Sequence, residues 1–149
     1  MVPSGERAGR TTVALVTDMG RPRGHAIGNA LEVREACGAL RGEGPEDLTD
    51  VCVGLAANML ALAGRGDVEA CRGMARGQIA NGEGLRKLEE IVSAQGGDAS
   101  ALRGDGAGLP RAGVTREVVA RRAGHVFSMD TERCGIASVA LGAGRARLG

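Results

Sequence analysis

The sequence has almost no aromatic residues. Phe127 is the single phenylalanine among 149 residues, and there is no tryptophan or tyrosine. A hydrophobic core must therefore be built from Leu, Val, Ala, Ile and Met, which bury less area per residue than aromatic side chains do. Because 26 of the residues are glycine as well, we expect a fold of marginal stability.

A strong net charge and a long apolar run are also missing. The formal net charge is +1, which gives no electrostatic reason to expect binding to nucleic acid or to an anionic membrane. No apolar run approaches the roughly twenty residues that a transmembrane helix needs, and the start of the chain has no signal-peptide pattern. These absences predict a cytoplasmic protein with no nucleic-acid or membrane partner.

Cysteine and histidine give little support for metal or redox chemistry. The cysteines are Cys37, Cys52, Cys71 and Cys134. They show no C-x-x-C spacing and no pairing with a nearby histidine, so a zinc site is not expected. Cys37 and Cys52 fall on or beside predicted apolar helix faces, and we interpret them as small buried hydrophobic residues. His25 and His125 have no evident carboxylate or cysteine partner, and neither is predicted to be catalytic.

What the chain does contain is a strand-like run followed by a glycine-rich loop. Residues 11–17 read TTVALVT, a short β-branched run that predicts a buried strand of a parallel sheet. The next residues include Gly20, Pro22, Gly24 and Gly28, which would let the backbone approach a ligand or a neighbouring loop closely. Because the Walker lysine and the dinucleotide glycine pattern are both missing, we interpret the loop as a tight strand-to-helix connection.

Apolar spacing and end signals predict helices over 29–40, 45–62, 67–79 and 84–95. Asn29 resembles an N-cap with Glu32 three residues later, and Pro45 suits the first position of the second helix. That second helix carries an apolar stripe at spacings of three and four residues, which predicts a core-facing side. The stripe consists of Leu48, Val51, Leu55, Met59 and Leu62.

The last third of the sequence predicts short strands. A stretch rich in Gly, Ala and Asp reads as a linker, and β-branched runs after it predict strands over 114–120, 124–129 and 136–141, with turns over 121–124 and 131–135. The expected fold class is α/β, a partial parallel sheet with helices, followed by an incomplete small α+β C-terminal domain. The expected divisions are 1–97, the linker 98–113 and the C-terminal domain 114–149.

The glycine loop and the helix after it contain sequence motifs of a known family. The chain reads TDMGRPRGHAIGNALEVREA over 17–36 and RGEGPEDL over 41–48. This resembles the thymidine and pyrimidine-nucleoside phosphorylases, whose segment reads roughly T-D-M-x-Q-P-L-G-x-x-V-G-N-A-L-E-V-x-E-A and then K-G-x-G-P-x-D-L. AQGGD over 94–98 and LGAGR over 141–145 follow in the family's order. The resemblance covers nearly the whole chain and matches the C-terminal portion of the family.

The resemblance implies reversible phosphorolysis, in which inorganic phosphate is the co-substrate and attacks the anomeric carbon of a pyrimidine nucleoside. The products are the free base and a (deoxy)ribose 1-phosphate. In the family, a Lys-His-Ser segment and a glycine-rich phosphate loop do this work upstream of the matching segment. Neither pattern occurs here, and Lys87, the only lysine, lies in an unrelated context. We therefore predict no catalytic and no cofactor-binding residue in this chain, and no turnover by the chain alone.

One site of the family maps onto residues of this chain. The resemblance implies a monovalent cation, potassium or sodium, held partly by oxygen ligands from the family's upstream glycine-rich region. In this chain its ligands would be the backbone carbonyls of Arg23 and Ala26 and the carboxylate of Glu35. Oxygen ligands suit a hard cation. Arg23 stands where the family has leucine, and its guanidinium could compete with the ion for Glu35. The alternative is that Glu35 is an ordinary exposed helix carboxylate.

Two classes of function remain open from the sequence. In the first, the chain is the C-terminal portion of a pyrimidine-nucleoside phosphorylase, and a separate chain carrying the N-terminal half supplies the catalytic segments; the resemblance also implies homodimers. In the second, it is a non-catalytic structural or interaction module that retains the scaffold. The anthranilate phosphoribosyltransferases are a more distant alternative with the same broad architecture.

Overall fold

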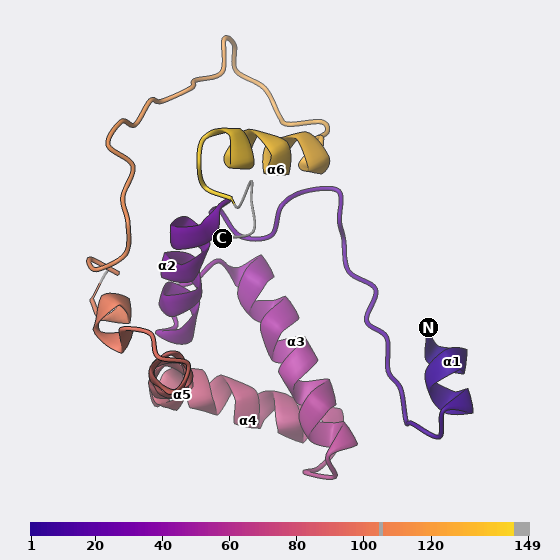
Figure 1. Ribbon diagram of the computed structural model, residues 1–149. Helices are drawn as coiled ribbons and strands as arrows, with labels where there is room; N and C mark the ends of the chain where they lie inside the picture. The colour runs from indigo at the N-terminus through magenta and orange to yellow at the C-terminus, as the bar shows by residue number, and fades with distance from the viewer. Residues whose placement is uncertain (105, 145–149) are drawn as a thin grey trace.

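The computed structural model describes residues 1–104 and 106–144, and these residues fold into helices joined by long irregular segments (Figure 1). In chain order the elements are α1 (Val2–Arg7), α2 (Asn29–Leu40), α3 (Glu46–Leu62), α4 (Val68–Ala80), α5 (Glu83–Ala94), the 3-10 helix η1 (Ala99–Leu102) and α6 (Thr131–Ala140). Figure 1 shows α2 to α5 grouped together, α6 above α2, and α1 set apart at the end of a long extended segment.

The predicted parallel sheet is wrong, because the described residues contain no β-strand. Residues 11–17 run as irregular extended backbone, and none of their N–H groups finds a main-chain acceptor within the described part of the chain. A strand becomes stable only when a neighbouring strand satisfies its backbone groups. The β-branched composition of this run is therefore not sufficient by itself, and the α/β assignment fails with it.

The predicted α+β C-terminal domain is also wrong. Residues 114–120 and 124–129 are irregular and exposed, and the third expected strand, 136–141, falls largely within α6. The expected turn at 131–135 is the first part of that helix. Asp130 caps it, since its side chain accepts a hydrogen bond from the Arg133 N–H at 3.0 Å. An aspartate in this position is a helix start signal, and it outweighs the β-branched residues that follow.

The four predicted helices are confirmed, with ends shifted by one residue or so. Gly28 rather than Asn29 is the N-cap of α2, and Pro45 is the N-cap of α3 rather than its first residue. Asp67 caps α4 by accepting a hydrogen bond from the Ala70 N–H at 2.8 Å. Local signals for helix ends therefore act in this chain as the sequence indicated.

The core is small, and the packing of α3 against α4 is its largest helix–helix contact. The buried hydrophobic residues of the described chain are Cys37, Val53, Ala57, Cys71 and Leu102. The predicted core-facing stripe of α3 is wrong, because its last three members, Leu55, Met59 and Leu62, are exposed. Small side chains on a neighbouring face of α3 pack on α4 instead, since they let the two helix axes approach closely.

The expected linker is partly attached to the helices. Leu102 in η1 is buried, and η1 contacts both α5 and α2. No helix among the described residues is both long enough and apolar enough to cross a membrane. The division of the chain at residues 97 and 113 stays a prediction.

Replacement of Val53, which is 2% exposed on α3, tests the position of this core. We expect Val53→Ala to lower the free energy of unfolding by about 2 kcal/mol, because the loss of buried methyl groups adds a cavity term to the lost transfer free energy. Val119→Ala is the matched control, because Val119 is 73% exposed, and it should change stability by less than about 0.5 kcal/mol. Urea unfolding followed by far-UV circular dichroism measures both, and equal effects would contradict this core.

Candidate functional site

The loop that precedes α2 is held by a carboxylate from α2 itself. Glu35 lies on the second turn of that helix and reaches back, so that its Oε1 accepts hydrogen bonds from the backbone N–H groups of His25 at 2.7 Å and Ala26 at 3.1 Å. Hydrogen bonds from backbone N–H groups to a carboxylate are charge-assisted. Glu35 is therefore a part-buried group that fixes the shape of the loop, and the alternative of an ordinary exposed helix carboxylate does not describe it.

Gly24 is the position of closest approach between the loop and Glu35. Its φ is +68°, and a Cβ there would stand 2.8 Å from Cδ of Glu35. The Gly24 N–H also donates a long hydrogen bond, 3.4 Å, to Oδ2 of Asp47 at the start of α3. Two carboxylates thus face the same loop. The sequence patterns gave Asp47 no such role, and its place in the G-P-x-D-L motif was the available signal for it.

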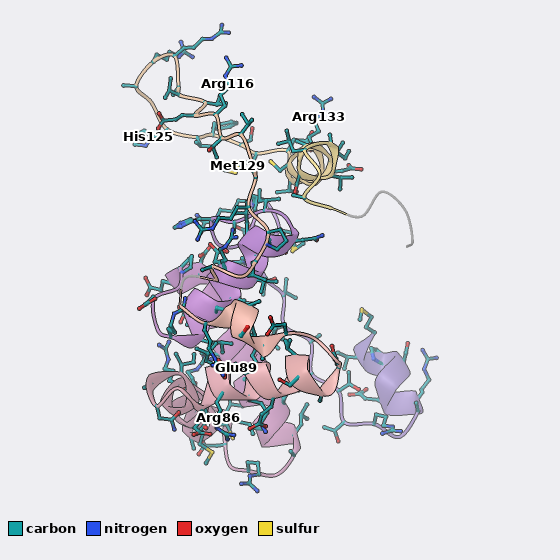
Figure 2. All side chains as sticks on the ribbon, turned by 60° about the vertical axis from the view of Figure 1, so that its left-hand side comes forward. Arg86, Glu89, Arg116, His125, Met129 and Arg133 are labelled. Atoms are coloured by element: carbon teal, nitrogen blue, oxygen red, sulfur yellow. The ribbon has the colours of Figure 1, made fainter. Side chains whose placement is uncertain are left out.

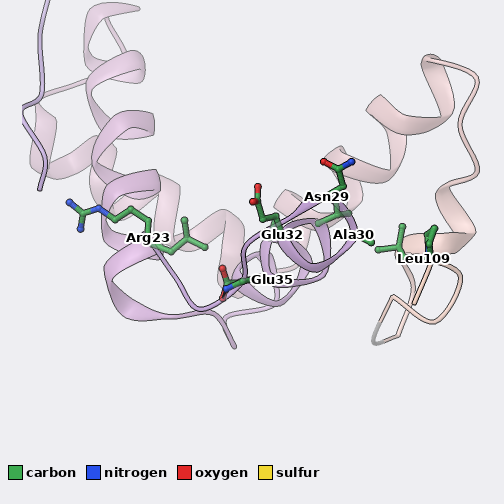
Figure 3. A pocket seen from close by; sticks show the side chains of 11 residues that line it. Arg23, Asn29, Ala30, Glu32, Glu35 and Leu109 are labelled. Atoms are coloured by element: carbon green, nitrogen blue, oxygen red, sulfur yellow. Dashed lines mark hydrogen bonds between the residues drawn. The ribbon is translucent and has the colours of Figure 1, made fainter. Parts of the chain in front are cut away.

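Arg23 does not compete for Glu35. Its Nη2 donates to the carbonyl oxygen of Asp18 at 2.8 Å, and Figure 3 shows the guanidinium turned away from Glu35. The Nε of Arg23 is buried without a hydrogen-bond partner in the described part of the chain. The departure from leucine therefore adds a contact to the preceding turn and leaves the carboxylate to the loop.

An open cavity of about 830 Å³ lies beside this loop. All three predicted cation residues line it, together with residues of α2, Leu48 of α3 and two residues from the segment after η1 (Figure 3). The full lining is Arg23, Ala26, Asn29, Ala30, Glu32, Val33, Glu35, Ala36, Leu48, Leu109 and Pro110. The structure therefore brings the predicted site residues to one place.

One wall of the cavity is held by Arg34. Its guanidinium donates to three backbone carbonyls of the segment after η1, through Nη2 to Leu109 at 2.9 Å and Pro110 at 2.8 Å, and through Nε to Gly106 at 3.3 Å. A planar guanidinium offers several donors in a fixed arrangement, so one side chain can fix several carbonyls at once. No pattern in the sequence indicated this role of Arg34, because its partners are backbone carbonyls more than seventy residues away.

The other end of the loop is joined to the segment that follows α6. Gly28 has φ +114°, and an added Cβ would come within 2.8 Å of Oγ of Ser138. The Asn29 N–H donates to the carbonyl of Ala143 at 2.8 Å, and Ser138 Oγ donates to the carbonyl of Ile27 at 3.4 Å. The G-N-A-L-E-V and L-G-A-G segments of the sequence therefore meet here, although more than a hundred residues separate them.

The carbonyl and carboxylate oxygens around the loop are of the chemical type that binds a monovalent cation. Both hydrogen bonds to Glu35 within the described chain use Oε1, so Oε2 is the oxygen available to an ion. No group of three or more His, Cys, Asp or Glu side chains in the described chain could hold a metal. The predicted assignment of Arg23, Ala26 and Glu35 remains a prediction.

The remaining candidates from the sequence lie apart from this cavity. His125 is on the exposed segment before α6, as Figure 2 shows. Cys37 is buried as predicted, and that burial raises the pKa of its thiol. The interpretation of Cys52 as a buried residue is wrong, because its side chain is exposed on α3.

Comparisons with known proteins agree with the resemblance seen in the sequence. A pyrimidine-nucleoside phosphorylase of Geobacillus stearothermophilus is 42% identical over 147 residues, which is 98% of this chain and 34% of the relative. The enzyme of that name from Bacillus subtilis gives the same values. The one from Staphylococcus haemolyticus is 41% identical over 146 residues, 97% of this chain and 34% of the relative. No family model matches the chain.

Nearly the whole chain is thus homologous to nucleoside phosphorylases. It spans about a third of the length of the curated relatives that it matches, each of which is named pyrimidine-nucleoside phosphorylase. The family resemblance is confirmed, and the length of the match agrees with a C-terminal portion.

Replacement of Gly24 tests the contact between the loop and Glu35. We expect Gly24→Ala to lower the free energy of unfolding by about 2 kcal/mol, because it adds left-handed backbone strain to a collision with the Glu35 carboxylate. Gly64→Ala is the matched control, since Gly64 has φ +73° and nothing lies within 4 Å of its added Cβ. It carries the backbone strain alone and should cost about 1 kcal/mol. Thermal unfolding measures both variants. Equal losses in the free energy of unfolding would contradict the contact between the loop and Glu35.

Proposed function

We propose that this chain is the C-terminal portion of a pyrimidine-nucleoside phosphorylase and contributes to the reversible phosphorolysis of pyrimidine nucleosides with inorganic phosphate as co-substrate. The observation that carries the proposal is the 42% identity to such enzymes over 98% of the chain. A cytoplasmic location, expected from the sequence, is part of the proposal.

The role proposed for this chain is to build and position the site, because its sequence does not contain the Lys-His-Ser and glycine-rich phosphate-loop patterns of the family. Phosphorolysis requires that the phosphate be held and that negative charge on the departing base be stabilised. The loop held by Glu35 and the wall held by Arg34 are arranged through fixed hydrogen bonds. Fixed elements of this kind support a site whose reacting groups come from other segments.

The assay for this proposal measures phosphorolysis directly. The chain alone, incubated with thymidine or uridine and phosphate, should release no free base detectable by chromatography. The chain co-expressed with the part of the Bacillus subtilis relative that lies outside their region of similarity should release it. Turnover by the chain alone would show that catalytic groups lie within these 149 residues.

The alternative, a structural or interaction module that has kept the scaffold, predicts a different result in the same assay. The co-expressed polypeptides would form a complex, yet no base would be released from either nucleoside. The second polypeptide expressed alone is the control, since any turnover that it shows unaided would not require this chain.

We further propose that Glu35, with the carbonyls of Arg23 and Ala26, holds potassium or sodium in the complete enzyme. The support is that these residues line one cavity and that Glu35 keeps one carboxylate oxygen outside its hydrogen bonds to the loop. A bound cation would neutralise the carboxylate charge next to the loop. Its proposed role is to stabilise the loop, and it takes no part in bond breaking.

A cation titration tests this site in the chain itself. At a cation concentration about ten times the dissociation constant, binding should add about 1.4 kcal/mol to the free energy of unfolding. Thermal unfolding in potassium chloride is compared with unfolding in N-methylglucamine chloride at the same ionic strength. Glu35→Gln should abolish the difference, because an amide oxygen can still accept the loop N–H groups but carries no charge.

Glu69→Gln is the matched control, since Glu69 is an exposed carboxylate on α4 away from the cavity, and it should leave the response to potassium unchanged. An unaltered melting temperature in both salts, or an equal potassium effect in Glu35→Gln, would remove the proposed ion.

A further inference from the structure

The peptide group between Ile27 and Gly28 is held on both of its edges. Its N–H donates a hydrogen bond to Oε1 of Glu32 on α2 at 2.7 Å. Its carbonyl accepts a hydrogen bond from Oγ of Ser138 on α6 at 3.4 Å. Because a peptide group is planar and its N–H and carbonyl point in opposite directions, partners on both edges fix its orientation.

The next peptide group, between Gly28 and Asn29, is held in the same way. Its carbonyl accepts a hydrogen bond from the N–H of Glu32 at 2.9 Å, and its N–H donates to the carbonyl of Ala143 at 2.8 Å. Both peptide groups that flank Gly28 therefore have one partner on α2 and a second partner on α6 or the turn after it.

The end of α6 sets the position of these two partners relative to each other. The N–H of Gly142 donates to the carbonyl of Val139 at 3.0 Å, and the N–H of Ala143 donates to the carbonyl of Ser138 at 3.0 Å. This is the Schellman pattern, which places a left-handed residue directly after the helix, and Gly142 has φ +87°. Ser138 and Ala143 are thus the two ends of one hydrogen-bonded turn.

This contact is the main polar attachment of α6. In the described chain, the bonds from Ser138 and to Ala143 are the hydrogen bonds that join α6 and the turn after it to another element. The helix has no buried residue, and it follows the long irregular segment 110–130 above α2 (Figure 1). An element with so few buried contacts opens more readily than the core does, so α6 can detach while the other helices stay folded.

We propose that α6 is a latch for the loop of the proposed cation site. When Ser138 and Ala143 are bonded to the loop, the loop has the shape described above. When α6 detaches, both peptide groups beside Gly28 lose one of their two partners. The inference rests on the proposed function, and it adds a means of regulating the same site.

The latch acts on the proposed cation ligand through a short stretch of backbone. Only the two dihedral angles of Ile27 separate its own carbonyl, which Ser138 holds, from the carbonyl of Ala26. A cation that binds the loop only while α6 is attached must favour attachment, and attachment must strengthen cation binding by the same factor. Ser138 is therefore a positioning residue, since it acts on the site through Ile27.

Hydrogen exchange of backbone amides, followed by NMR without added potassium, tests the latch. Ser138→Ala removes one of its two hydrogen bonds, so α6 should detach more often. The Asn29 amide reports the detachment directly, and its exchange should become about threefold faster or more. The amides of His25 and Ala26, which are bonded to Glu35, should become faster by a similar factor because the loop opens as one unit.

Ser93→Ala is the matched control, because Ser93 is an exposed serine on α5. It should leave the three loop amides within about 1.5-fold of the parent chain. The amide of Val53, in the core on α3, should exchange at the same rate in all of these chains, which shows that the faster exchange is local to the loop.

A substitution on the opposite side of the loop tests the coupling in reverse. Glu35→Ala removes the acceptor for the N–H groups of His25 and Ala26. It should also speed exchange at Asn29 about threefold or more, although the acceptor of that amide is Ala143. In the parent chain, potassium at ten times its dissociation constant should slow Asn29 exchange about tenfold.

Each outcome decides between the latch and a local contact. Faster exchange at Asn29 alone in Ser138→Ala, or an unchanged Asn29 rate in Glu35→Ala, overturns the proposal. If Ser138→Ala does not fold, which the Val53 amide would show, Glu35→Ala is the deciding variant. Potassium that raises the melting temperature without slowing Asn29 exchange also overturns it.

Failure of the proposed function gives a different result. If potassium changes neither the melting temperature nor the Asn29 rate while both variants open the loop, the cation is removed and the hold of α6 on the loop stands. Absence of base release in the co-expression assay removes the phosphorolysis proposal and leaves these exchange rates unaffected.

Discussion

The packing of α3 on α4 is the contact on which the rest of the structure depends. It buries small side chains, Val53 and Ala57 on α3 and Cys71 on α4, and it orders the helices that flank it. Since the chain has almost no aromatic side chains, close approach through small residues is the available way to gain contact area. The same choice leaves the larger apolar residues Leu55, Met59 and Leu62 of α3 exposed.

The loop before α2 depends on that helical group without being part of its core. Glu35 from α2 and Asp47 from α3 approach it from two helices, so the relative placement of these helices determines the shape of the loop. Arg34 attaches the wall formed by residues 106–110 to the same helix. The cavity is therefore defined by polar contacts that α2 makes on both of its sides, with α3 supplying the second carboxylate.

The helices predicted from the sequence are confirmed, whereas the predicted sheet is wrong. Helix signals are local: Asp67 and the apolar spacing of residues 29–40 act within a few residues of themselves. A strand depends on a partner that the sequence of the strand does not contain, so the run at 11–17 could be recognised as extended and apolar but not as paired. For the site, the family motif singled out Arg23, Ala26 and Glu35, which line one cavity, and their role as cation ligands stays a prediction. The motif gave no sign of Arg34, whose partners are backbone carbonyls more than seventy residues away.

The hydrogen bonds from Arg34 to the segment after η1 affect how this protein can change during evolution. The three bonds go to main-chain oxygens, which every amino acid supplies, so substitutions at Leu109 would not weaken the attachment. The side chain of Leu109 faces the cavity at a position that is free to vary, while its backbone is anchored. Natural selection can thus alter the size and polarity of the cavity wall through a single residue without having to rebuild the segment that carries it.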